Sequence, residues 1–169
     1  FYSGVTQPEV EAFYANADTR VSRGINSRLV KLGGAVFEQV QRVGGLYTQA
    51  IERIVGWLEK PAGCAENEAQ RAALQKLIRF YRTGSLEDWD DYNIAWLRDT
   101  ESHVDVVNGF IEVYNDPLGM RGTFESVVSF RDPEATRRIG TIAGAAQWFE
   151  DHMPFFGRHK KRRVTGISG

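Results

Sequence analysis

The residue types best suited to chemistry lie in the segment 108–125, where acidic, phenolic and basic side chains follow closely on one another. Glu112 and Tyr114 stand two positions apart in a run rich in Val, Ile and Phe, so an extended strand would point both side chains to one face. A carboxylate and a phenol on one face can accept hydrogen bonds from an ammonium group, or pair with an arginine such as Arg121. Glu125, on the next strand-like run, could add a second carboxylate. The segment therefore predicts a site for a cationic group.

A second interpretation of the same pattern is structural. Asn108 and Phe110 share the predicted face with Glu112 and Tyr114, and a half-exposed sheet commonly turns such a face to solvent. Periodicity alone favours this solvated face, and the choice between it and a binding face stays open at this level.

Neither a metal site nor a nucleophilic centre is predicted within the chain. Metal ligands are recognised in a sequence when they stand one helical turn apart, as in HExxH, and none of the histidines is paired in this way. The single cysteine, Cys64, cannot form an internal disulfide and has no neighbouring base in the sequence that would activate it. The histidines are His103, His152 and His159.

Composition indicates a folded domain with little charge bias. Of 169 residues, 42% are hydrophobic and 25% charged, and 21 basic against 22 acidic residues give a formal net charge of −1, which is typical of soluble globular domains. Apolar runs fall far short of the ~20 residues of a membrane helix, so no membrane partner is expected. Five of the 21 basic residues gather in 158–163, which leaves 16 basic and 22 acidic residues elsewhere. Because no aromatic residues interleave with this basic tail, nucleic-acid binding is not predicted.

Hydrophobic periodicity and capping residues predict the elements that must position the candidate site. Two strand-like runs, His103–Tyr114 and Thr123–Phe130, enclose a turn-forming segment, Asn115–Gly119. A hairpin with arms Ile25–Lys31 and Ala35–Val43 is expected around a glycine turn. Helices are predicted over Pro8–Ala17 (capped by Thr6), Thr48–Lys60, Asn67–Arg82, Ser85–Arg98 and Asp132–Glu150. The expected fold class is α+β, with helices packed on an antiparallel or mixed β-core.

The sequence also predicts how one helix ends, how another begins and which of its side chains face the core. Pro61 and Gly63 are expected to end the helix that begins at Thr48. Ser85 and Asp88 resemble a capping box, in which Asp replaces the usual Glu. The core-facing side chains expected in that last helix before the strands are Leu86, Trp89, Ile94 and Leu97.

The segment 109–125, Gly-Phe-Ile-Glu-Val-Tyr-Asn-Asp-Pro-Leu-Gly-Met-Arg-Gly-Thr-Phe-Glu, resembles the GFIE-x-Y-x-DP-x-G-x-RG-x-(F/W)-E segment of the dipeptidyl peptidase III family of zinc metallopeptidases. Other segments resemble that family in the same order, most closely its bacterial members, so nearly the whole chain is covered. These segments are 1–4 (Phe-Tyr-Ser-Gly), 24–31, 47–55, 81–86 and 146–151.

The resemblance implies that the chain is part of a two-lobed zinc exopeptidase that releases dipeptides from the amino termini of peptides. Family members hold zinc with an HExxxH helix and a further Glu-bearing motif, both downstream of the matched region and both absent from this sequence. We therefore expect residues 1–169 to be a single domain or fragment, mostly from the lobe with the β-core, with 132–169 leading toward the zinc lobe. Zinc would belong to the intact enzyme, and this chain alone would bind none and be inactive.

The resemblance also implies roles for the candidate residues. Glu112 and Tyr114 would bind the free α-amino group and first residues of the peptide, and Glu125 would be a weaker candidate in the same cleft. Asp116 and Arg121 would hold the loop together, and no catalytic residue is expected in this chain. The implied partners are short peptides with a free N-terminus and the remaining zinc-bearing lobe of the same polypeptide, in the cytoplasm. The alternative is a non-catalytic binding or interaction module with the same fold.

Overall fold

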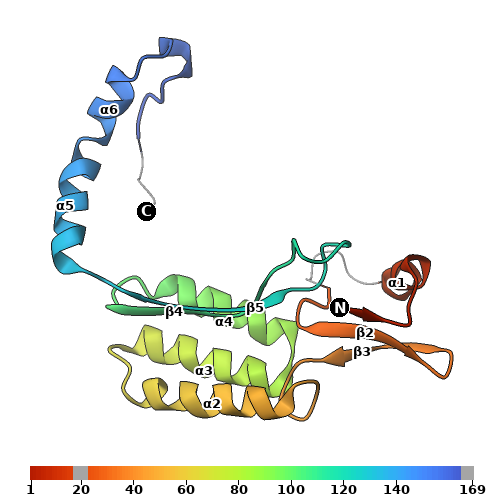
Figure 1. Ribbon diagram of the computed structural model, residues 1–169. Coiled ribbons are helices and arrows are strands. Elements are labelled where there is room, and N and C mark those ends of the chain that lie inside the picture. Colours follow the sequence, from red (N-terminus) through yellow and green to blue (C-terminus); the bar gives the residue numbers. More distant parts are fainter. Residues whose placement is uncertain (17–22, 165–169) are drawn as a thin grey trace. The chain divides into compact units, whose positions relative to one another are not determined.

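Residues 1–16 and 23–164 are described by the computed structural model of the chain (Figure 1), which divides into two units, Phe1–Ser129 and Phe130–Gly169. The first unit contains β1 (Tyr2–Ser3), α1 (Gln7–Tyr14), β2 (Ser27–Leu32), β3 (Ala35–Val40), α2 (Thr48–Gly63), α3 (Glu68–Thr83), α4 (Leu86–Arg98) and β4 (Val104–Glu112), and β5 (Thr123–Phe130) ends at its boundary. The second unit contains α5 (Pro133–Gly144), α6 (Ala146–His152) and the short 3-10 turn η1 (Gly157–His159). The α+β prediction is confirmed.

The amino-terminal sheet has the strand order β1-β2-β3. β2 and β3 form the predicted antiparallel hairpin around Gly33 and Gly34, whose φ angles of 58° and 85° suit a tight two-residue turn. β1 pairs in parallel with β2 and was not predicted, because two residues are too short to show a pattern. α1 begins at the predicted cap, Thr6, whose backbone N–H and hydroxyl both donate to the Glu9 carboxylate. The predicted end of this helix, Ala17, lies outside the described residues.

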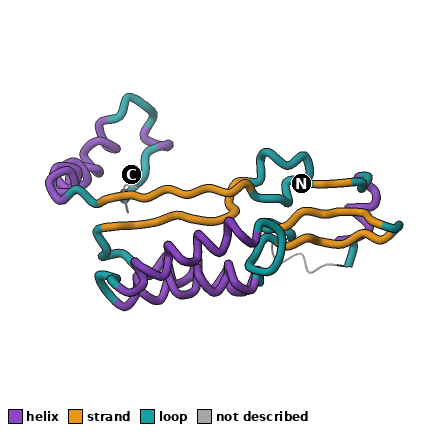
Figure 2. The backbone as a smooth tube through the Cα atoms, turned by 60° about the horizontal axis from the view of Figure 1, so that its bottom comes forward, coloured by secondary structure: helices purple, strands orange, loops and turns teal. Residues whose placement is uncertain are grey.

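The helices α2, α3 and α4 pack side by side against the sheet formed by β4 and β5 (Figures 1 and 2). Their shared core is centred on α3, which begins at the predicted cap Asn67 and ends at Gly84 in a left-handed conformation with φ 69°. Phe110 of β4 enters this core and so joins the sheet to the helices. The buried residues of α3 are Ala73, Leu74, Leu77, Ile78, Phe80 and Tyr81.

α2 ends at Gly63 and α4 begins after Ser85 as predicted, but two details at these helix ends differ from the prediction. α2 continues through Pro61 to Gly63, because a proline in the last turn removes one backbone hydrogen bond without breaking a longer helix. At the start of α4, the Ser85 side chain makes no capping hydrogen bond. Asp88 is buried instead, where it accepts a hydrogen bond from the Thr83 hydroxyl and pairs with Arg79 at 2.8 Å.

The predicted core face of α4 was partly wrong. Trp89 is buried as expected, but Ile94 and Leu97 are 50% and 68% exposed. Tyr92 and Ala95 occupy the buried face with Trp89, since they follow it at the helical spacing of three and six residues. The exposed pair therefore lies outside the packed face.

The second unit is a pair of helices with no buried side chains in its described elements. The single predicted helix Asp132–Glu150 is broken at Ala145, whose φ of −94° and ψ of 5° interrupt the helical backbone between α5 and α6. Asp132 caps α5 as predicted, because its carboxylate accepts hydrogen bonds from the backbone N–H groups of Glu134 and Ala135. Among the described residues, no helix has both the length and the hydropathy needed to cross a membrane.

Candidate functional site

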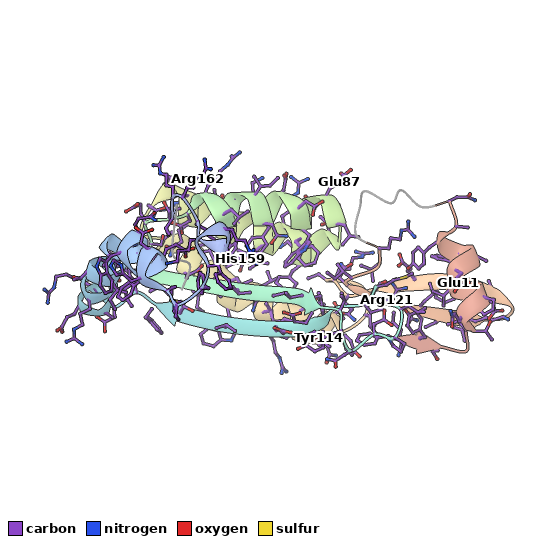
Figure 3. All side chains as sticks on the ribbon, turned by 90° about the horizontal axis from the view of Figure 1, so that it is seen from above. Glu11, Glu87, Tyr114, Arg121, His159 and Arg162 are labelled. Atoms are coloured by element: carbon purple, nitrogen blue, oxygen red, sulfur yellow. The ribbon has the colours of Figure 1, made fainter. Side chains whose placement is uncertain are left out.

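The three predicted site residues lie around the connection between β4 and β5, in the first unit. Glu112 is the last residue of β4, Tyr114 follows in the loop 113–122, and Glu125 is the third residue of β5. Figure 3 marks Tyr114 and Arg121 on this loop. Tyr114 is 75% exposed, whereas Glu112 and Glu125 are half-buried. All three carry polar oxygen atoms that a peptide terminus could approach from solvent.

The expected alternation does not extend to Tyr114. β4 ends at Glu112, and a turn begins at Val113, whose carbonyl accepts a hydrogen bond of 3.0 Å from the Asp116 N–H. The chain leaves the strand there, so the position of Tyr114 relative to Glu112 is set by the loop and not by the pleat. For this reason the predicted strand extends two residues too far at its carboxyl end.

The face of β4 that carries Asn108 and Phe110 is not solvated. Both residues are buried, and the Tyr81 hydroxyl of α3 donates a hydrogen bond to the Asn108 side chain, which in turn donates to Ser126 of β5. The solvated-face interpretation concerned Glu112 and Tyr114, of which Tyr114 is exposed and Glu112 half-buried. Glu112 lies at the end of a packed face, where the strand emerges from between the helices and β5.

Thr123 lies between the Glu112 backbone and the Glu125 side chain. Its hydroxyl lies 3.2 Å from the Glu112 carbonyl oxygen and 3.4 Å from Glu125 Oε1. A hydroxyl has one hydrogen and donates it to one of these acceptors at a time. The Glu112 backbone and the Glu125 carboxylate thus meet on either side of one small side chain, at the start of β5.

Asp116 closes the loop from within. Its Oδ2 accepts hydrogen bonds of 2.8 Å from the N–H groups of Met120 and Arg121 and from the Tyr2 hydroxyl, and Oδ1 accepts one of 3.1 Å from the Leu118 N–H. Burial disfavours the charged carboxylate, but these donors outweigh it and hold the pKa of Asp116 below its ordinary value. Asp116 therefore stays ionised to a lower pH than an ordinary aspartate and remains an acceptor for these donors.

Arg121 is fully buried, with no exposed side-chain surface, so a peptide in solution cannot reach it in this arrangement. The expectation that Asp116 and Arg121 hold the loop together agrees with these contacts. Sequence reasoning missed their partners Tyr2, Tyr14 and Glu38, which lie between 83 and 114 residues earlier and show no local pattern that points to the loop.

A metal centre is not formed by the part of the chain that the structure describes, where no three His, Cys, Asp or Glu side chains gather around one point. His103 contacts only one carboxylate in that set, with its Nδ1 2.8 Å from Glu66 Oε2. A zinc ion normally takes three or four such ligands. The residues present therefore do not fit a zinc site.

An apolar groove of about 440 Å³ runs along α2, α3 and the sheet, away from the candidate carboxylates. Trp57, Leu74 and Trp96 line it from the helices, and Val106 and Val128 line it from the strands. Glu112, Tyr114 and Glu125 are not among the described residues that form its walls.

The amino-acid sequence of the chain matches that of a known protein family. A sequence model described as Peptidase family M49 matches residues 11–165. The chain belongs to peptidase family M49. The matched range includes all of the β4–β5 connection, and with it the three candidate residues.

Curated relatives of this M49 chain carry the name dipeptidyl peptidase 3. The Dictyostelium discoideum protein is 31% identical over 123 residues, which are 73% of this chain and 18% of the relative. The Nematostella vectensis protein is 29% identical over 117 residues, or 69% and 16%. The human protein is 29% identical over 111 residues, or 66% and 15%. The chain thus spans less than a fifth of the length of these relatives.

Two solved structures share the fold of this M49 chain. The structure of DPP III from Caldithrix abyssi superimposes with a TM-score of 0.74 at 21% identity, over 96% of this chain and 31% of that one. DPP III from Corallococcus sp. strain EGB gives a TM-score of 0.66 at 19% identity, over 96% and 30%. At these identities the likeness concerns the fold.

Proposed function

We propose that this chain supplies the wall that binds the peptide amino terminus in a zinc-dependent exopeptidase, one that releases dipeptides from the N-termini of short peptides. Glu112 and Tyr114 receive the charged α-amino group and the first residues of the peptide, and Glu125 contributes a second carboxylate. The observation that carries the proposal is the M49 match across the β4–β5 connection, where the Thr123 hydroxyl lies between the Glu112 backbone carbonyl and the Glu125 carboxylate.

The chemistry of the terminus supports these roles. A peptide α-amino group has an ordinary pKa near 8, so it is mostly charged at neutral pH and seeks carboxylate and phenol oxygens. An enzyme that removes two residues at a time must measure a fixed distance from that charge to the bond it cleaves. A carboxylate at the end of a packed strand would hold the ammonium at a fixed distance from the bond that is cleaved.

The proposal assigns the zinc ligands to another part of the polypeptide, because the described residues do not form a metal site. In this arrangement, residues 1–169 come mostly from the lobe with the β-core, and 132–169 lead toward the zinc-bearing lobe. We also propose a cytoplasmic location, which the family resemblance and the single cysteine support. This chain alone is then inactive, and the remaining lobe of the same polypeptide is its partner.

The test uses the full-length polypeptide that contains this chain. Glu112→Gln removes the negative charge and Tyr114→Phe removes the hydroxyl, and each loses a charge-assisted hydrogen bond to the substrate. We expect kcat/KM for a dipeptide-releasing substrate to fall by about 10- to 100-fold in each variant. Zinc content, measured by elemental analysis, should stay at the wild-type level.

Glu11→Gln is the matched control, because Glu11 is an exposed carboxylate on α1 that bonds only to Gln7 among the described residues. Its kcat/KM should equal that of the wild type. Unchanged kinetics in both Glu112→Gln and Tyr114→Phe would refute the assignment of these residues. A folded full-length protein without peptidase activity or zinc would instead favour the non-catalytic binding module.

A further inference from the structure

A cluster of charged and phenolic side chains, of which Tyr14, Asp116 and Arg121 are buried and Tyr2 and Glu38 half-buried, lies between the loop 113–122 and the amino-terminal elements. We call it the Arg121 anchor. Its members are Tyr2, Tyr14, Glu38, Asp116 and Arg121.

The guanidinium of Arg121 reaches out of the loop to three separate parts of the chain. Its Nη1 donates to the carbonyl oxygens of Gly24 at 3.1 Å and Arg23 at 3.3 Å, and its Nη2 donates to the Tyr14 hydroxyl at 2.7 Å. The Tyr14 hydroxyl donates in turn to Glu38, whose Oε1 lies 3.8 Å from Nη2. A fork of fixed, planar donors therefore joins the loop to α1, to β3 and to the segment before β2.

The loop is held at a second point by Asp116, which accepts the Tyr2 hydroxyl of β1 at 2.8 Å while it also binds the loop's own N–H groups. Leu118 and Met120, on the same loop, pack against the small core of Val10, Tyr14 and Leu29. The loop that carries Tyr114 thus packs against the amino-terminal elements through Asp116, Leu118 and Met120.

The phenol rings of the anchor also lie around the charge. The guanidinium carbon of Arg121 is 5.4 Å from the ring centre of Tyr2 and 5.3 Å from that of Tyr14, which is the range of cation–π attraction. Burial, followed by a hydrogen bond to a carboxylate, raises the pKa of both phenols, so they remain neutral donors.

We propose that Arg121 and Asp116 are positioning residues for peptide binding, which fix the loop 113–122 so that Tyr114 stands at one place beside Glu112. The inference rests on the proposed function. A buried ion network of this kind adds little net stability compared with apolar side chains of similar volume, but it fixes one geometry through directional bonds. Apolar packing alone is not directional, so it would fix the conformation of the loop less strictly.

The experiment uses the full-length polypeptide and two inhibitors, a short peptide with a free amino terminus and its N-acetylated form. The readout is the ratio of their inhibition constants, which reports how well the ammonium is received. We expect Arg121→Met and Asp116→Asn to lower the wild-type ratio by about tenfold. Tyr14→Phe, which keeps the ring but removes the hydroxyl between Arg121 and Glu38, should lower it by a smaller factor.

Leu77→Ala is the control for general destabilisation, because Leu77 is fully buried in the helical core around α3 and apart from the anchor. It should lower the melting temperature and leave the inhibition ratio unchanged. Melting temperatures of all variants identify those that fold, and if Arg121→Met does not fold, Asp116→Asn and Tyr14→Phe decide the test.

The two proposals fail in different ways. Folded anchor variants that keep the wild-type ratio, while Glu112→Gln loses it, would overturn the positioning role alone. A wild-type protein that does not discriminate between the two peptides would overturn the proposed function, and the positioning role with it.

Discussion

Gly24 shows how closely the Arg121 guanidinium fits against the backbone. Its φ of 60° lies in the left-handed region, and a Cβ atom built there would stand 1.7 Å from Arg121 Nη1 and 2.6 Å from Glu38 Oε1. Two separate constraints therefore require glycine at this position, the backbone conformation and the space beside the anchor.

A pair of glycine substitutions separates these two constraints. Gly24→Ala should destabilise the protein by more than about 3 kcal/mol, because it combines the left-handed backbone with displacement of a buried guanidinium. Gly33→Ala has a similar φ of 58° but open space around its Cβ, so it should cost only about 1–2 kcal/mol. Denaturant unfolding of both variants measures the difference. Equal losses would mean that Arg121 moves aside freely and is not held where it lies.

Among the elements, the start of β4 is fixed by a single carboxylate from the connection between α2 and α3. Glu66 accepts hydrogen bonds from the backbone N–H groups of His103 and Val104, at 3.0 Å and 3.1 Å, and its Oε2 lies 2.8 Å from the His103 ring. These contacts, with the backbone N–H of His103 first, lower the pKa of Glu66 from 4.5 to about 2. The helices and the sheet are therefore joined here through an ionised side chain.

The Glu66 carboxylate should make the free energy of unfolding depend on pH, and comparison with a Glu66→Gln variant isolates this contribution. Because the folded pKa of Glu66 lies below the unfolded value of 4.5, its stabilisation is complete above about pH 5 and is lost as the pH falls toward about 2. The wild type should thus be more stable than Glu66→Gln at neutral pH, and the difference should shrink through this window. Denaturant unfolding of both proteins across the pH range measures it.

Glu68→Gln is the control for that titration, since Glu68 is 88% exposed and pairs only with Arg71 three residues on, within the described part of the chain. Its stability relative to the wild type should change little over the same range. A constant difference between wild type and Glu66→Gln from neutral to acid pH would contradict the role given to Glu66.

Most elements could be predicted because their signals are local. Asn67 and Gly84 mark the ends of α3, Asp132 marks the start of α5, and Gly33 with Gly34 marks the hairpin turn. Each of these residues acts through its own backbone or its near neighbours. Such signals survive in a single sequence.

The parts that could not be predicted depend on contacts between distant residues. Asp88 was expected to cap α4, but it is taken into an ion pair with Arg79 on α3. The candidate site likewise combines a residue with a local sequence signal and a residue positioned by distant contacts. Glu112 could be placed at a strand by its apolar neighbours, whereas the place of Tyr114 depends on a loop whose partners, Tyr2 and Tyr14, come from the opposite end of the unit.

At the scale of the whole molecule, the two units differ in how they bury apolar surface. The first has an extensive core around α3, while α5 and α6 of the second have no buried residues and expose Ile139, Ile142 and Trp148. Helices of 12 and 7 residues are marginal in water without a packed face. The described helices of the second unit therefore gain little stability from packing within the unit.

A peptide of residues 130–169 tests this difference. It should give a mostly coil-like far-UV circular dichroism spectrum in water and melt without a cooperative transition, because short helices gain little without packing. The polypeptide 1–129 should unfold cooperatively under the same conditions. A peptide that melts cooperatively as a helix pair would show instead that the second unit stabilises itself.

The Arg121 anchor has a consequence for the order in which the protein is made. Its bonds join residues 107 and 114 positions apart, Tyr14 to Arg121 and Tyr2 to Asp116. On the ribosome, the two tyrosines emerge before their partners and must wait while almost the entire first unit is synthesised. Contacts of such long separation close slowly because the intervening chain must first be ordered. The amino-terminal sheet therefore reaches its final packing only after the loop 113–122 has been synthesised, and the loop beside Glu112 is completed at the same moment.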